Sequence, residues 1–429
     1  MQQKNKDALK YHSEGRSGKT EIIPTKPVRT PEELALAYSP GAVFAAEGIS
    51  HNRWNAYKYT NKGNLVGIIG NGSNISDTKA KGAMAAKPLL EARSMLFKIY
   101  ADIDAFDIEI AEENSDRLIE IIHSMAPTFG AIALSSIEAP QCYYIERKLR
   151  GLLDIPIIND NRCGKAVCCA AAIMNAMEFA CKKSEEIKVL LNSNESAITE
   201  MLLQTGIKQE NITILENKKE SLLSNAIKNR DIFIAVSKEN IITGNDLSAM
   251  SHDPIVILLS DVSIDTEPDK AKGIRSDAII VTCNENTRNT INDVIAFPYI
   301  FRAALDTYAT SINDTMLIAA AKAIAQLAQR PVPASLQKMY KGEHRYSREY
   351  LLPLPNDRRL ATEVSVAVAK AAMKSGIARN PIVNWEEYCN TLLSRLEREY
   401  RFYREIFYHH RSSPKLRRRY NRTMPSITL

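Results

Sequence analysis

The stretch GAIALSSIEAPQCYYIERKLRGLLDIPIIND, residues 130–160, contains the pattern that decides the fold. A short apolar run at 130–134 is bounded by glycine and serine, which predicts a buried strand. Residues 138–149 carry apolar side chains at helical spacing, and a second apolar run follows at 155–158. A strand, a helix and a second strand in this order predict a βαβ unit with parallel strands.

The same alternation extends from this unit toward both ends of the chain. Further strands are predicted at 64–72, 106–110, 185–191, 212–215, 232–236, 255–259 and 278–281, and helices at 83–100, 116–126, 164–182, 310–329 and 360–375. The later strands follow one another in the rhythm of a doubly wound sheet. We therefore expect an α/β protein with one domain over residues 1–160 and a second over 161–380.

The two ends of the chain have a different character. The first 30 residues contain Lys, Gly and Pro and predict an extended arm, which ends where Thr30 and Pro31 start a helix. The following segment LALAYSPG, residues 34–41, is helical or a turn and is stopped by Pro-Gly. A third segment, 381–429, is expected to hold a long helix at 385–410 and a basic tail.

Composition excludes several classes of protein. With 45% hydrophobic and 25% charged residues the chain is typical of a folded globular protein, and 429 residues suit two domains. The polar start lacks the apolar segment of a secretory signal, and no apolar run is long enough to span a membrane. We expect a cytoplasmic protein without a membrane span.

The seven cysteines are scattered and odd in number, so we expect reduced thiols rather than a disulfide framework. Cys163, Cys168 and Cys169 lie close together in sequence, which raises the possibility of a metal cluster. Their spacing matches no zinc pattern, and no histidine lies nearby. We therefore favour structural thiols.

Several segments, in order along the chain, resemble bacterial malic enzymes. They are LAYSPG (36–41), YKYTNKGNLV (57–66), IEI (108–110), APTFG (126–130), IPIIND (155–160) and FPYIFR (297–302). The resemblance implies an N-terminal substrate and metal domain followed by a Rossmann-like NAD(P)-binding domain. It implies a family reaction in which malate is oxidised with NAD(P) and decarboxylated to pyruvate on Mg²⁺ or Mn²⁺.

The resemblance also assigns the groups that transfer protons. The family's tyrosine acid falls on Tyr38, which is retained, and its lysine base falls on Arg93. Arginine stays protonated near neutral pH and cannot act as a base there. Lys87 resembles another family lysine near the substrate and is the possible replacement, although it lies almost two helical turns away.

The family's three metal-binding carboxylates fall on Ser135, Ser136 and Asn161. Neutral hydroxyl and amide groups should bind Mg²⁺ or Mn²⁺ very weakly. Asp160 is an acidic neighbour that we expect to cap the helix that follows. We therefore expect no metal site.

The glycine-rich dinucleotide loop falls on Ser193, Asn194 and Glu195, where glycine is absent and Glu195 introduces a negative charge. A turn that caps a helix is the simpler interpretation of these residues. Asn292 retains one position of an Asn-Asn pair, beside Asp293, and an Asn-Pro pair has become residues 261–262. We therefore expect no NAD(P) cofactor.

These substitutions lead to three hypotheses. The first is a pseudoenzyme of the malic enzyme family that acts as a scaffold or regulatory subunit, as a homodimer or with an active paralogue. The second is an NAD(P)-dependent oxidoreductase of low activity or altered specificity for hydroxy acids. A dicarboxylate could bind weakly in either case.

The third hypothesis concerns the end of the chain, where aromatic residues precede an arginine cluster at 411–422. Such a pattern can bind nucleic acid or an anionic membrane surface. We favour a solvated helix whose aromatic residues pack on the body. Many bacterial relatives continue here into a phosphotransacetylase-like domain, so the tail is alternatively the remnant of a lost junction.

Overall fold

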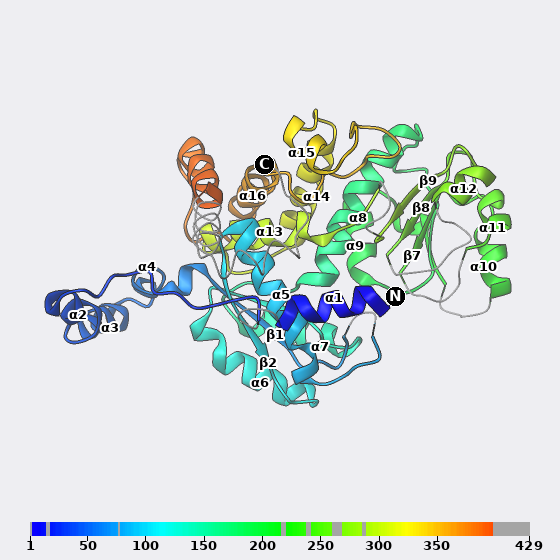
Figure 1. Cartoon of the computed structure of the whole chain (residues 1–429). Helices are drawn as coiled ribbons and strands as arrows, with labels where there is room; N and C mark the ends of the chain where they lie inside the picture. The colour runs from blue at the N-terminus through cyan, green and yellow to red at the C-terminus, as the bar shows by residue number, and fades with distance from the viewer. Residues whose placement is uncertain are drawn as a thin grey trace.

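The computed structural model describes residues 2–13, 18–75, 78–215, 220–236, 242–259, 268–284 and 289–397. Within these ranges the chain forms two parallel sheets flanked by helices (Figure 1). None of the helices in this part of the chain combines the length and the apolar character needed to cross a membrane. The α/β fold expected from the sequence is confirmed.

The first sheet has the strand order β2-β1-β3-β4, with all strands parallel. Its strands are β1 (Leu65–Gly70), β2 (Asp104–Glu109), β3 (Ala131–Leu134) and β4 (Ile157–Asn159). Successive side chains of β1 point to opposite faces. Leu65 and Ile69 pack with α6 (Ser115–Met125) and α7 (Gln141–Leu152), whereas Val66 and Ile68 pack with α5 (Ala83–Ala101). Thus α5 and α7 cover opposite faces of this sheet.

The second sheet has the order β6-β5-β7-β8-β9, also fully parallel. Its strands are β5 (Val189–Leu191), β6 (Ile212–Ile214), β7 (Ile232–Ala235), β8 (Ile255–Leu258) and β9 (Ile279–Thr282). This is the order of a doubly wound sheet, and the direction of winding reverses between β5 and β7. In such sheets ligands bind outside the carboxyl ends of the strands at that reversal.

A shared hydrophobic core joins the two sheets. It is built around α8 (Asp160–Phe179), α13 (Phe297–Asp306), α14 (Asp314–Ala328) and α16 (Arg359–Lys374). The small side chains of α8 permit this close packing. The other helices of this half are α9 (Ser196–Gln204), α10 (Glu220–Ala226), α11 (Gly244–Ala249), α12 (Pro268–Ile274) and α15 (Ala334–Met339), with short η3 (Gln209–Asn211) and η4 (Asp293–Ile295).

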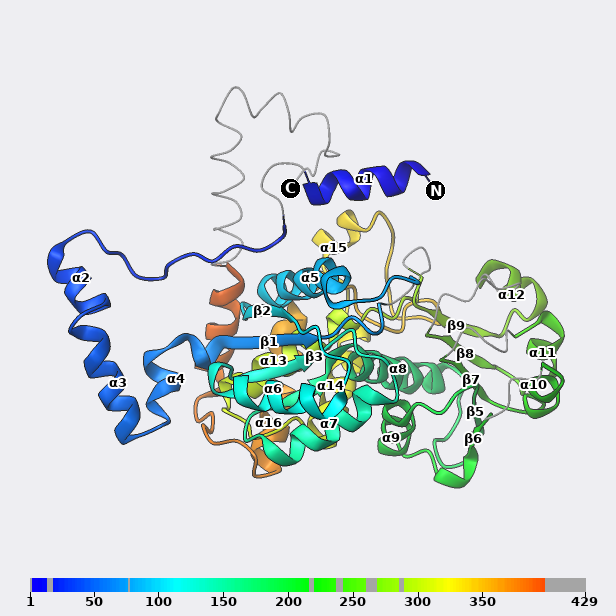
Figure 2. The same cartoon turned by 90° about the horizontal axis from the view of Figure 1, so that it is seen from below.

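An arm of short helices projects from the first sheet (Figures 1 and 2). It consists of α2 (Pro31–Ala37), α3 (Gly41–His51) and α4 (Asn55–Tyr59), followed by η1 (Asn61–Asn64). α2 begins where the Thr30 hydroxyl accepts a hydrogen bond from the Glu33 amide. No residue of the three helices is buried.

The base of the arm is held against the body by aromatic contacts. The guanidinium carbons of Arg53 and Arg379 lie 5.0 and 4.5 Å from the ring of Trp54. The ring of Tyr57 packs on Tyr308 at 4.5 Å. The arm is therefore anchored at its base, whereas α2 and α3 contain no buried residue and stand apart from the body (Figure 2).

Each strand predicted from the sequence is confirmed, but the ends of the chain require corrections. Residues 2–13 form helix α1 (Gln2–Ser13) instead of an extended arm. α3 and α13 were not predicted, and α8 begins at Asp160 instead of Gly164. Residues 385–397 are helical as expected. The remainder of that predicted helix and the basic tail lie outside the described residues.

Candidate functional site

The carboxyl edge of the first sheet brings together the three positions assigned to metal ligands. Ser135 directly follows β3, is buried, and donates its amide hydrogen to the Ile69 carbonyl at 2.9 Å. Ser136 adopts a left-handed conformation with φ of 53°. Asn161 lies in the first turn of α8, directly after β4. The side chains of residues 160–162 lie outside the described part of the structure, so the predicted cap at Asp160 stays a prediction.

Arg93 on α5 forms an ion pair with Asp293 of η4. Its Nη2 lies 2.6 Å from the Asp293 Oδ2, and both side chains are only 14% exposed. The guanidinium also stacks over Phe297, 4.2 Å from the ring centroid. Gly164 permits this arrangement, because a Cβ there would lie 2.8 Å from the Asp293 Cβ. The positive charge of Arg93 is thus already neutralised by the chain itself.

Lys87 also belongs to α5, but its side chain contacts the end of β2 instead of η4. Its Nζ is 2.5 Å from an Asp107 oxygen and 3.4 Å from a Glu109 oxygen. Partial burial lowers the pKa of Lys87, but the hydrogen bond and the charge of Asp107 outweigh it, so the pKa is raised overall. A lysine with a raised pKa stays protonated and is a poorer base.

Glu109 is a polar residue of this edge that the sequence did not single out. Burial raises the pKa of its carboxyl group despite the neighbouring Lys87. Its Oε1 is buried without a hydrogen-bond partner among the described residues. The segment 108–110 was predicted as part of a strand and contributed to the family resemblance, but no role was assigned to Glu109 itself.

Tyr38 lies at the end of α2 on the projecting arm, and it is 74% exposed. Within the described residues no contact joins it to Arg93, Lys87 or Ser135. The structure therefore does not bring the predicted acid and base together in one chain.

The loop after β5 lies at the reversal point of the second sheet. Asn192 is buried there, and its side-chain oxygen accepts a hydrogen bond from the Val236 amide at 2.7 Å. The backbone amide of Asn192 donates a hydrogen bond to the Ile234 carbonyl at 3.2 Å. Asn192 thus extends the pairing of the neighbouring strands β5 and β7 beyond their carboxyl ends.

Ser193 and Asn194 continue this loop, and Glu195 occupies the residue before α9. The Glu195 side chain makes no capping hydrogen bond to α9, so the prediction of a helix cap is wrong here. Its Oε2 instead accepts a hydrogen bond from the Tyr143 hydroxyl of α7 at 2.8 Å. The loop is therefore connected to the first half of the chain.

A cavity of about 390 Å³ adjoins this contact. α7 contributes Arg147 and Arg150 to its wall, whereas α9 contributes Glu200 and α14 contributes Asp314. Arg150 forms an ion pair with Glu146 of its own helix at 2.6 Å. The lining carries charges of both signs, so it does not define a site for one class of ion.

Asn292, the retained cofactor position, serves a local structural role. Its side-chain oxygen accepts a hydrogen bond from the Val294 amide at 3.1 Å. Its carbonyl accepts a weak hydrogen bond from the Cys168 thiol, with the sulfur at 3.6 Å. The two residues at 261–262 lie outside the described residues.

The cysteines do not form a reactive or metal-binding group. None of the seven is part of a disulfide, and Cys163, Cys168 and Cys169 are buried. Burial raises the pKa of the Cys168 and Cys169 thiols, so both stay protonated. Within the described ranges, metal-like spacing occurs at His252, Asp253 and Asp277 alone.

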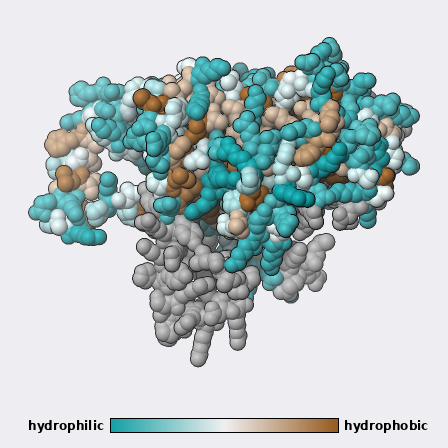
Figure 3. All heavy atoms as spheres, turned by 90° about the horizontal axis from the view of Figure 1, so that it is seen from above, coloured by the Kyte–Doolittle hydropathy of each residue, from teal (hydrophilic) through white to brown (hydrophobic). Residues whose placement is uncertain are grey.

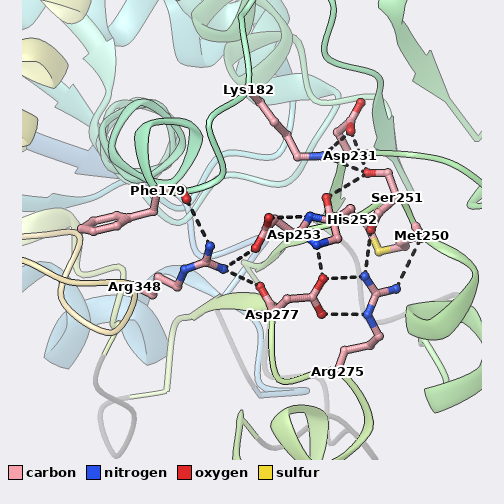
Figure 4. Close-up of polar contacts among 10 residues, drawn as sticks. All are labelled: Phe179, Lys182, Asp231, Met250, Ser251, His252, Asp253, Arg275, Asp277 and Arg348. Atoms are coloured by element: carbon pink, nitrogen blue, oxygen red, sulfur yellow. Dashed lines mark hydrogen bonds and ion pairs between the residues drawn. The ribbon is translucent and has the colours of Figure 1, made fainter.

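The cluster of His252, Asp253 and Asp277 is part of an ion-pair network (Figure 4). Asp277 accepts two hydrogen bonds from Arg275 at 2.8 and 2.7 Å, which hold the pKa of its carboxyl group below its usual value. Asp253 pairs with Arg348 at 2.5 Å and with His252 at 2.6 Å. The cluster precedes β8 and β9, at the amino edge of the sheet. Because arginines already neutralise both carboxylates, the cluster offers little to a metal ion.

Comparisons with known proteins agree with the geometry of the two sheets. A family described as "Malic enzyme, N-terminal domain" matches residues 17–150. An NADP-dependent malic enzyme of Haemophilus influenzae is 38% identical over 93% of this chain and 56% of its own length. The chain thus spans little more than half of that relative. An NADP-dependent malic enzyme of Halomonas elongata is 36% identical over 88% of this chain and 96% of its own length.

Among solved structures, a malic enzyme from Pyrococcus horikoshii superposes with a TM-score of 0.83 and 31% identity, covering 97% of this chain and 99% of its own. The structural likeness and the identity to the Halomonas protein extend over both sheets and over nearly the full length of each relative. The chain belongs to the malic enzyme family.

Proposed function

We propose that the protein is a malic-enzyme-like subunit that does not catalyse the oxidative decarboxylation of malate and acts instead as a scaffold or regulatory partner. The observation that carries this proposal is the ion pair between Arg93 and Asp293. At the position where the family places a base, a permanently charged guanidinium is paired, half-stacked on Phe297 and removed from solvent.

The groups that would hold a metal and a dinucleotide also fit poorly. Ser135, Ser136 and Asn161 offer only neutral oxygens, and a divalent cation needs carboxylates to balance its charge. The loop after β5 lacks glycine, and Glu195 adds a carboxylate to the loop where the family binds the pyrophosphate. We derive no reaction step through either group. A dicarboxylate without metal stays a possible weak ligand.

The projecting arm supports the second part of the proposal. Leu36 and Phe44 are 76% and 65% exposed on helices that bury nothing, and Figure 3 shows hydrophobic atoms on this lobe. Exposed apolar side chains gathered on one element mark an association surface. We propose that the arm joins two copies of this chain, or joins this chain to an active paralogue.

The decisive experiment measures turnover. Purified protein at micromolar concentration is incubated with malate, Mn²⁺ and either NAD or NADP, and reduced nucleotide is followed by absorbance. We expect no turnover above a protein-free control. Turnover at a rate typical of an active family member, assayed in parallel, overturns the proposal.

A binding experiment separates the silent subunit from an oxidoreductase of altered specificity. An oxidoreductase that uses NAD or NADP must bind it, and binding to the folded state raises the unfolding temperature. We expect no shift in thermal unfolding at millimolar NAD or NADP. A shift that grows with nucleotide concentration contradicts the loss of the cofactor site.

A further inference from the structure

We infer that Tyr143 and Glu195 form a clasp that holds the two sheet-bearing halves of the chain together across their cleft when no ligand is bound. The inference rests on the proposed function, because it assigns a present role to a residue of the former phosphate loop. Glu195 belongs to the turn before α9, and Tyr143 belongs to α7 of the first half. Their hydrogen bond of 2.8 Å is partly buried.

The opposite side of the first sheet provides the fixed contact between the halves. There Phe97 of α5 packs edge-on against Phe297 and Phe301 of α13, with ring centroids 4.9 and 5.0 Å apart. The Arg93–Asp293 ion pair lies at the start of the same helix. Buried apolar and ionic contacts of this kind separate at high cost, so this side acts as the pivot.

On the side of α7, the 390 Å³ cavity lies between α7 and α9 and is lined by residues of both helices. α5 and α7 cover opposite faces of the first sheet, so a rotation about the α5 contact widens or narrows this cavity. The hydrogen bond between Tyr143 and Glu195 joins α7 to the start of α9 beside this cavity. Hydrogen bonds to a charged group are stronger than neutral ones, so this contact favours the closed arrangement of the two halves.

The clasp also explains why the Glu195 carboxylate does not cap α9. An acidic residue before a helix ordinarily accepts hydrogen bonds from the first amides. Here its side chain turns to the other half of the molecule. Glu195 therefore makes a hydrogen bond between the two halves in place of a hydrogen bond to the first turn of α9.

The test is hydrogen–deuterium exchange on the full chain with the variant Tyr143→Phe, which removes the hydroxyl without removing the ring. We expect the amides of α9 to exchange about tenfold faster than in the wild type, since about 1.4 kcal/mol corresponds to a factor of ten. Tyr144→Phe is the matched control. The Tyr144 hydroxyl donates to Asp116 at 2.7 Å within the first half, so its loss should leave α9 unchanged.

Glu195→Gln provides a second variant that keeps an acceptor but removes the charge, and we expect a smaller increase in the same amides. If Tyr143→Phe and Glu195→Gln both exchange like the wild type, or if Tyr144→Phe accelerates α9 equally, there is no clasp. The turnover assay is separate: an active wild-type protein refutes the proposed silence, whereas unchanged exchange refutes only the clasp.

Discussion

Position 93 decides what the cleft can do chemically, because Asp293 faces it. A carboxylate at 2.6 Å favours the charged form of whatever base stands opposite. A lysine there would also be held as an ammonium ion by Asp293. The substitution at 93 and the presence of Asp293 are therefore two separate obstacles to proton abstraction.

The ion pair should matter for stability. Replacing Arg93 by methionine leaves the Asp293 carboxylate 14% exposed without its guanidinium, and breaking a buried pair in this way costs about 3–5 kcal/mol. We expect a loss of about 3 kcal/mol in the free energy of unfolding, measured in urea. Val383→Met, at a residue 90% exposed, serves as the control. A loss below about 1 kcal/mol at position 93 would mean that the pair is incidental.

Restoring the lysine alone should not restore the reaction. We expect no malate-dependent reduction of NADP by the single variant Arg93→Lys or by the double variant Arg93→Lys with Asp293→Asn. In both variants Ser135 and Ser136 still offer only neutral oxygens, which bind a divalent cation very weakly. The assay compares both variants with the wild type at saturating Mn²⁺. Turnover in either variant would show that the metal and dinucleotide positions are functional.

Lys87 gives a prediction for alkaline pH. Its pKa is raised above the ordinary value of 10.5, so its contacts with Asp107 and Glu109 stabilise the fold fully below pH 10.5. That stabilisation is lost as the pH rises through the raised pKa. We expect the difference in unfolding free energy between the wild type and Lys87→Met to be constant from pH 7 to 9 and to shrink above pH 10.5. A difference that shrinks near pH 8 would identify Lys87 as a possible base.

At the scale of helices and strands, most strands were predictable because they are short apolar runs, and β1, β3 and β8 are buried on both faces. β2 is less buried and was predicted from its alternating pattern instead. α13 was missed because it is apolar on nearly all sides and contains Pro298 near its start. α1 was missed for the opposite reason, since its sequence is polar throughout.

The site was predictable only as far as residue identity. The sequence indicated that Arg93 replaces a base and that Glu195 replaces a glycine. It could not indicate that Arg93 meets Asp293 or that Glu195 meets Tyr143, because these partners are 200 and 52 residues away. Such contacts depend on how distant segments of the chain pack on one another, and a local pattern carries no information about that packing.

The network in Figure 4 connects the starts of β8 and β9, and it should make stability depend on acidic pH. The pKa of Asp277 is lowered below its ordinary 3.8, so its contribution is present above that value and is lost as the pH falls below it. We expect Asp277→Asn to cost about 1–2 kcal/mol at pH 7 and progressively less below pH 4. Unfolding is followed by circular dichroism.

Glu186→Gln is the control for that measurement, because Glu186 forms an exposed pair with Lys183 at 3.9 Å. Exposed pairs contribute little to stability. A cost for Asp277→Asn that stays constant down to pH 3 would show that the residue acts through the pattern of its hydrogen bonds with Arg275 and not through its charge.

For the whole molecule, the arm predicts association. Leu36→Glu with Phe44→Glu places charges on the exposed apolar face of the arm and should convert an assembled species to a monomer in sedimentation experiments. Val383→Glu adds a charge at an equally exposed apolar residue outside the arm and should leave the mass unchanged. A wild-type protein that sediments as a monomer at all concentrations would exclude the arm as a contact between copies of this chain.

The helices α2 and α3 of the arm are short and contain no buried residue. α2 and α3 contain 7 and 11 residues, and isolated helices shorter than about 12–15 residues are marginal in water. Since the stacked Trp54 holds only the base of the arm, the order of the distal part must come from whatever covers it. Diluting the protein should therefore melt the arm before the body, so that helix content becomes a readout of binding by mass action.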